Sequence, residues 1–151
     1  MDRAVAMVSL AVTKVSAQTN IKGNNSVSGS MSVDAVGKFV DQAEDCDEAI
    51  CLMPYYLSLE LKAMDHKGDK ELFNVSIDTE ATFRISREYF DLAKKDTLVR
   101  EDVSADMAHA IYVGVRSYFE QTFSILGVKN VHMPWVLDLG DVLHEGQDAA
   151  K

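Results

Sequence analysis

Two runs of alternating apolar and polar residues occupy the middle of the chain. Apolar side chains fall on every second position from Met53 to Leu61 and again from Phe73 to Ile85, where Thr79 is the one exception. Successive side chains on a strand point to opposite faces, so each run predicts a strand with one apolar and one polar face. The linker over 65–69 is charged and contains a glycine, which suits a reversal. The pattern predicts a long antiparallel hairpin with one face towards a core.

The residues before this hairpin give weaker patterns. Alternation over 4–15, with Val and Thr, predicts a first strand. The polar, Gly- and Ser-rich segment 18–32 predicts a long mobile loop. The spacing over 32–40 fits a short helix and a strand equally well. The acidic segment 41–48 is interpreted as a solvated connection.

The period of the pattern changes at Ser86. This serine is placed to cap a short helix over Arg87–Lys95, which has an acid in its first turn and lysines in its last. A charged connection is expected over 96–102. A long helix is predicted over Ser104–Leu126, with its first serine as N-cap and Gly127 just past its end.

The middle of the long helix, residues 110–115, is apolar nearly all round. A surface helix would have a polar side, so this one must be covered on two sides. Its own sheet is one cover, and we expect a second subunit to be the other, with Val113, Gly114 and Val115 at the interface. Gly114 would let a second backbone approach closely.

These elements predict a single α+β domain over residues 1–151. Its core is an antiparallel sheet of three or four strands packed by the long helix. Pro134 keeps the segment after the helix extended, and residues 146–151 are expected to fray. Whether residues 137–151 form a second helix stays open.

Composition and charge narrow the function. The chain is 47% hydrophobic and 26% charged, with a formal net charge of -9. Nucleic acid is disfavoured as a partner, because phosphate contacts need clusters of Lys and Arg. No window approaches the ~20 apolar residues of a membrane span, and the first residues do not read as a signal peptide. A cytoplasmic protein is expected.

Residue types that carry chemistry are scattered. Cys46 and Cys51 allow a disulfide, but a reduced, structural pair is favoured. None of the four histidines has metal-ligand spacing with another, and no nucleotide or nucleophile motif is present. Asp78 and Glu80 are interpreted as part of a solvated strand face, and Arg116 as half of a salt bridge or backbone clamp. We therefore expect no enzyme activity, no metal and no cofactor.

The end of the chain carries a resemblance to a known family. An apolar run ending in an arginine (Ile111–Arg116) is followed by Gly127, by the extended segment Val131–Pro134, and by Leu137–Leu139. Together with the long hairpin, this order resembles the SecB-like export chaperones over roughly residues 4–143. Two features depart from the family. Gly114 and Val115 stand where a proline usually precedes the arginine, and the second C-terminal helix is normally longer.

The resemblance implies ATP-independent holding of unfolded or extended polypeptides, in export or in protection of an antitoxin, by an acidic homodimer or homotetramer. A client would lie against aromatic side chains: Tyr55, Tyr56, Phe73, Phe83 and Trp135. Tyr55 and Phe83 share the apolar strand faces, so Tyr56 and Trp135 are the better candidates for exposure. Two alternatives remain: a small acidic inhibitor or adaptor of one folded basic partner, and an enzyme whose site is made of scattered residues.

Overall fold

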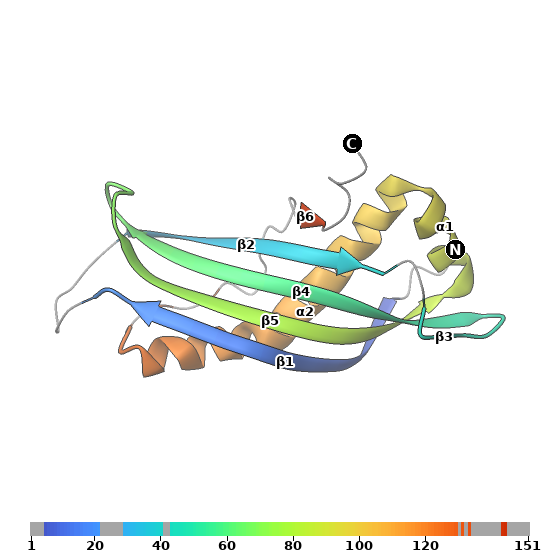
Figure 1. The fold of residues 1–151 in the computed structure, drawn as a ribbon, viewed down its shortest axis with the longest axis horizontal. Coiled ribbons are helices and arrows are strands. Elements are labelled where there is room, and N and C mark those ends of the chain that lie inside the picture. The colour runs from blue at the N-terminus through green and yellow to red at the C-terminus, as the bar shows by residue number, and fades with distance from the viewer. Residues whose placement is uncertain are drawn as a thin grey trace.

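The structure is a computed structural model, and it describes residues 5–21, 29–40, 43–129, 131, 133 and 143–144. The elements in chain order are β1 (Val5–Thr19), β2 (Gly29–Phe39), β3 (Asp45–Cys46), β4 (Ile50–Asp65), β5 (Glu71–Ser86), α1 (Arg87–Lys95), α2 (Thr97–Ile125) and β6 (Leu143–His144). The main path of the sheet runs β1-β5-β4-β2-β6, and β3 also pairs with β4 (Figure 1). The α+β prediction is confirmed: four strands are long, and the short β3 and β6 add to them.

The β4–β5 hairpin has the alternation that the sequence predicts. Leu57 pairs with Thr79 and Leu61 with Val75 in an antiparallel register, and these side chains are buried on one face of the sheet. In the turn, Gly68 has φ 70°, a left-handed conformation that favours glycine. The Asp65 carboxylate accepts a hydrogen bond from the Asp69 N–H at 2.9 Å and closes the turn.

Helix α2 covers the apolar face of this hairpin. Figure 1 shows it crossing one face of the sheet, with its last turns reaching past β1. Its buried side chains recur every three or four residues, from Val103 to Phe123, which places them on one side of the helix. Phe123 packs against Phe73 with ring centroids 5.5 Å apart. The opposite face of the sheet carries polar side chains, such as the Lys62–Glu60 ion pair at 3.1 Å.

The predicted N-cap of α1 is confirmed, and that of α2 is not. Ser86 caps α1 by accepting a hydrogen bond from the Tyr89 N–H at 3.3 Å. However, α2 begins at Thr97, and its N-cap is Asp96, which accepts from the Leu98 N–H at 2.9 Å. The predicted N-cap, Ser104, is wrong. The residues expected to form a charged connection extend the helix: Glu101 and Asp102 are exposed, and Arg100 donates to the carbonyls of Ala93 and Lys94 at the end of α1. Past the other end of α2, Gly127 has φ 75° as expected.

Several connections are shorter than predicted. β1 continues to Thr19 and β2 begins at Gly29, so both ends of the expected loop over 18–32 are strand. The ambiguous segment 32–40 is strand through Phe39, paired along β4. The acidic connection 41–48 contains β3. Residues 22–28 and the tail 146–151 lie outside the described residues.

The expectation of a reduced cysteine pair is wrong. Cys46 and Cys51 form a disulfide, with Cα atoms 4.2 Å apart. The two residues are direct cross-strand neighbours in the β3–β4 pairing, so their side chains leave the sheet on the same face. No sequence pattern predicted β3, and without this strand the pairing of the two cysteines could not be inferred.

Ser104 instead meets Tyr55 in the core. The two hydroxyls share a hydrogen bond of 2.5 Å, and both side chains are fully buried. Burial raises the pKa of Tyr55 from 10.0 to about 12, and the hydrogen bond from Ser104 offsets only part of this effect. The interior therefore holds the phenol neutral at a pH where the unfolded chain ionises it.

The shift predicts an alkaline loss of stability. Because the folded pKa is raised, the stabilisation is complete below pH 10 and disappears as the pH rises through 12. Urea unfolding should give a free energy about 2 kcal/mol lower at pH 12 than at pH 10 from this group. Tyr55→Phe should remove this contribution to the slope of the unfolding free energy against pH. Tyr56→Phe, on the solvent-exposed face, should retain it. An unchanged slope in Tyr55→Phe would contradict this assignment.

Candidate polypeptide-binding surface

The structure does not bring the five predicted aromatic residues together. Tyr55, Phe73 and Phe83 lie in the core, where Tyr55 and Phe83 pack edge to face with ring centroids 6.3 Å apart. Their side chains stabilise the α2–sheet contact and are not available to a client. Tyr56 is on the opposite face of β4 and is 40% exposed. Trp135 lies outside the described residues.

Tyr56 belongs to a short apolar row on the outer face of the sheet. Leu52, Pro54 and Tyr56 alternate along β4, so they point to the same face. Pro54 is buried and Leu52 half-buried, which leaves the tyrosine as the exposed end of this Tyr56 row. Across the sheet, Tyr56 pairs with Lys38 on one side and Glu80 on the other. The row therefore offers an aromatic contact between two charges of opposite sign.

The three residues predicted for an oligomer interface point in different directions. Val113 is 52% exposed, whereas Val115 is fully buried against the sheet. Gly114 faces β1: a Cβ atom at this position would lie 2.7 Å from Leu10 Cδ2. The missing side chain thus lets α2 approach its own strand closely. Val115 belongs to the core, and the absence of a Gly114 side chain serves a contact within the chain.

Apolar residues line the place where α2 passes β1, and several of their side chains are exposed. On β1 they are Met7, Leu10 and Val15, which pair with residues whose side chains face the core. On α2 they are Gly114, Tyr118 and Ile125, which share one side of the helix. We call these six residues the β1–α2 strip. Val15 and Tyr118 are each 44% exposed, and Ile125 has the most exposed large apolar side chain among the described residues.

Strand β1 also leaves one edge of the sheet open. It pairs with β5 on one side, and no described strand pairs with its other side. Natural edge strands are usually protected by charges, prolines or bulges. Two register shifts interrupt β1, but its residues Val5–Thr19 include a single charge, Lys14, and no proline. A long, weakly protected edge next to an apolar strip is suited to pairing with another chain.

On the other side of α2, a polar clamp holds the C-terminal segment. The Arg116 Nε and Nη2 atoms both donate to the Met133 carbonyl, at 3.0 and 2.8 Å. Glu120 accepts from the Met133 N–H at 3.3 Å and pairs with Arg116 at 3.1 Å. Arg116 therefore makes both of the expected interactions, the salt bridge and the backbone clamp. It leaves the Met133 side chain buried.

The clamp should contribute measurable stability. Arg116→Ala removes two charge-assisted hydrogen bonds and an ion pair that is largely shielded from solvent, and should lower the free energy of unfolding by about 2–3 kcal/mol. Glu120→Gln retains an oxygen that can accept from the Met133 N–H, so it should cost about 1 kcal/mol or less. Urea unfolding measures both. Equal losses in the two variants would contradict a clamp in which the arginine is the main donor.

Other kinds of site find little support in the described part of the chain. No group of three or more His, Cys, Asp or Glu side chains could hold a metal ion there. No helix in the same residues is long and apolar enough to cross a membrane. Asp78 and Glu80 lie on the outer sheet face, where they pair across strands with Ser58 and Tyr56.

Comparisons with known proteins agree with this architecture. Neither a scan of protein-family models nor a search of curated protein sequences finds a match. Among solved structures, the chain matches the Mycobacterium tuberculosis Rv1957 SecB-like chaperone in complex with a ChAD peptide from the Rv1956 HigA1 antitoxin. The TM-score is 0.56 at 10% sequence identity, over 90% of this chain and 91% of that chain. At this identity the likeness is one of fold, and the chain has the α+β fold of a SecB-like chaperone.

Proposed function

We propose that this protein holds unfolded or extended polypeptides without ATP. The observation that carries the proposal is the fold shared, over nine tenths of the chain, with a SecB-like chaperone that was solved with a bound antitoxin peptide. Exposed apolar side chains on the Tyr56 row and the β1–α2 strip supply the kind of surface that such binding needs. The charged surface, with a net charge of -9, would keep a loaded complex in solution.

The Tyr56 row is our candidate for the first contact with a client. An exposed aromatic ring beside a rigid proline offers apolar area at low entropic cost. Lys38 and Glu80 flank the ring, so polar groups of an extended chain would find partners of either sign. We propose Trp135, also expected to contact clients, as a second aromatic contact. Precursors awaiting export and antitoxins awaiting folding, both in the cytoplasm, are the client classes that we would test.

The proposal predicts nucleotide-independent protection of an unfolded protein. The purified chain should reduce light scattering from an aggregating, cysteine-free client. Tyr56→Ser should weaken client binding by about 1 kcal/mol, or roughly five-fold, because about half of a tyrosine's burial is lost. The control is Leu98→Ser, which removes a 73% exposed apolar side chain at the start of α2, away from both surfaces.

Two results would contradict this proposal. If the wild-type protein protects no unfolded client, the acidic inhibitor or adaptor becomes the leading function, and salt-sensitive binding to a folded basic partner would support it. If Tyr56→Ser and Leu98→Ser bind equally well, the client surface is not the Tyr56 row.

We further propose that the β1 edge and the β1–α2 strip associate with a second copy of this chain. Two β1 strands paired antiparallel would join their sheets and cover Val15 and Tyr118. The charge distribution favours such a pair. The whole chain carries -9, but β1 contains only Lys14, so two copies would meet where neither presents acidic strand residues. The exposed Val113 lies on the same helix, and we retain it with Gly114 as part of this interface.

A charge placed in the strip should dissociate the pair. Val15→Glu puts a carboxylate opposite its symmetry mate, and we expect the dimer dissociation constant to rise at least ten-fold. Ser16→Glu adds the same charge to the outer face of β1 and should change the constant less than three-fold. Light scattering across a dilution series measures both. A wild-type protein that is monomeric at micromolar concentration would rule out the proposed association.

A further inference from the structure

Strand β3 covers part of an edge of β4. β2 and β3 lie on the same side of β4: Phe39 pairs with Tyr55, and farther along Asp45 pairs with Leu52. The two registers differ by three residues. If β3 left β4, the edge of β4 from Ile50 to the point where β2 takes over would have no partner. That edge belongs to the same stretch of β4 as Leu52 and Pro54 of the Tyr56 row.

The non-covalent attachment of β3 is slight. Outside the strand ladder, one backbone hydrogen bond among the described residues holds the start of β3, from the Glu44 N–H to Leu52 O at 2.9 Å, and a second, from the Asp47 N–H to Ile50 O at 3.0 Å, closes the turn that follows. β3 is two residues long, and both of them are exposed. A strand pair this short and solvated is not stable by itself. The Cys46–Cys51 disulfide is the strongest connection between β3 and β4.

The charge of the segment also favours its release. Glu44, Asp45, Asp47 and Glu48 are exposed carboxylates within five consecutive residues, and like charges this close repel one another. The turn that follows is held separately. The Asp47 carboxylate accepts from the N–H groups of Ala49 and Ile50, each at 2.7 Å, and Arg87 Nη1 donates to Asp47 O at 3.0 Å. Breaking the disulfide would therefore free β3 and leave the turn attached to the start of α1.

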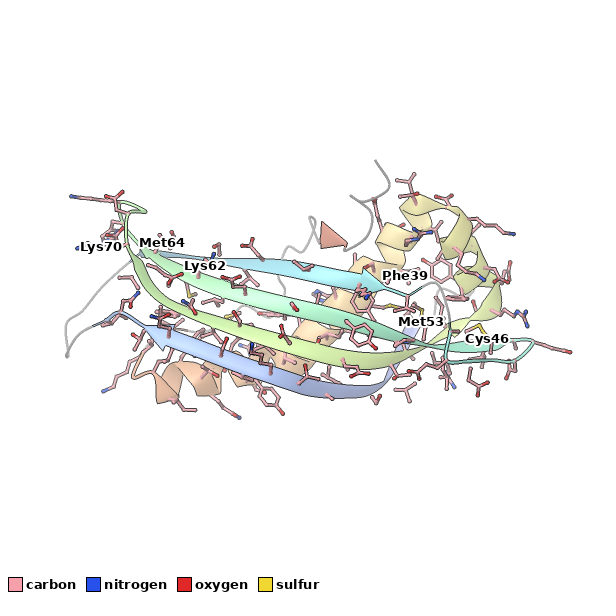
Figure 2. All side chains as sticks on the ribbon, viewed as in Figure 1. Phe39, Cys46, Met53, Lys62, Met64 and Lys70 are labelled. Carbon is pink, nitrogen blue, oxygen red and sulfur yellow. A yellow bond between two sulfur atoms is a disulfide. The ribbon has the colours of Figure 1, made fainter. Side chains whose placement is uncertain are left out.

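We propose that the Cys46–Cys51 disulfide is a redox-controlled latch on the β4 edge. The oxidised chain keeps the edge closed with β3, and reduction by a dithiol opens it to an extended polypeptide, which would add as a strand. The claim that an extended polypeptide adds to the opened edge rests on the proposed holding function. Figure 2 shows Cys46 at the end of the sheet opposite the turn labelled by Lys70, so the latch acts on one end of the hairpin only.

The chemistry of opening is thiol–disulfide exchange. Cys46 is exposed, whereas Cys51 is fully buried. A thiolate of the reductant would therefore attack Sγ of Cys46. A mixed disulfide forms there, and Cys51 leaves as a thiolate that takes up a proton. The second thiol of the reductant then attacks the mixed disulfide, releases Cys46 as a thiol and leaves the reductant as its own disulfide. Two electrons and two protons pass from the dithiol to the protein.

Amide hydrogen exchange tests the latch directly. In the chain-entropy description, closing a ring over residues 46–51 favours the closed form roughly forty-fold. Dithiothreitol should therefore raise exchange at the Glu44 amide by roughly ten- to a hundred-fold. The Asp96 amide, which caps the end of α1, serves as the internal control and should not change. Cys46→Ser should exchange as the reduced protein does, with or without the reductant.

Two results would overturn the latch. One is an air-oxidised protein that still titrates two free thiols. The other is an exchange rate of the Glu44 amide that does not respond to reduction or to Cys46→Ser.

Binding of the cysteine-free client separates the latch from the holding function. Tighter binding by several-fold to both the reduced protein and Cys46→Ser supports a latch that controls the edge. If exchange increases but binding is equal in both redox states, control of client binding is overturned and the holding function stands. If neither state binds the client while exchange still responds to reduction, the holding function fails and the opening of β3 is supported.

Discussion

The structure depends on one contact, between the apolar face of the β4–β5 hairpin and the buried side of α2. Because side chains on paired strands share a face, the register of the hairpin fixes all of its inward positions at once, and a slip by one residue would turn them outward. Phe73–Phe123 packing and the Tyr55–Ser104 hydrogen bond tie this face to the helix at separate points. The length of α2 follows from its packing on this face. A helix that began at Ser104 would lack the turns that lead from α1 onto the sheet.

That contact uses nearly all the large aromatic side chains of the hairpin. The polypeptide-binding surface that we propose must therefore be made from what the core leaves outside: the outer face of β4, the edge strand β1, and the side of α2 next to β1. Each of these is a modest surface, with apolar residues set among charges. Such surfaces suit contacts that are extended along a chain and tolerant of its sequence, in contrast to a deep pocket, which selects one ligand by shape.

The sequence predicted the parts of the fold that are governed by local periodicity. Alternation identified the hairpin, and Ser86 located the start of α1. The failures have a common cause, which is that the deciding partner was distant in sequence. Asp96 and Ser104 are both competent N-caps, and only the burial of Ser104 against Tyr55 decides between them. The disulfide could not be inferred without β3, a strand too short to have a pattern. The site was harder still: alternation indicated that Tyr55 and Phe83 face the core, but the β1–α2 strip has no signature, because its residues come from two distant segments.

Sheet edges connect these observations. An extended polypeptide that is bound away from water can satisfy its backbone groups by pairing with a strand, and a sheet offers unpaired backbone groups only at its edges. This fold has a long edge at β1, with little charge to protect it, and a shorter edge at the start of β4, which β3 covers. The two differ in the way they are closed. No described strand pairs with the free edge of β1, for which we propose a second copy of the chain as partner, whereas the start of β4 is covered by β3, an acidic segment fastened by one disulfide bond. Under the two proposals above, the β1 edge serves assembly, whereas the start of the β4 edge is exposed to an extended chain only after the disulfide is reduced.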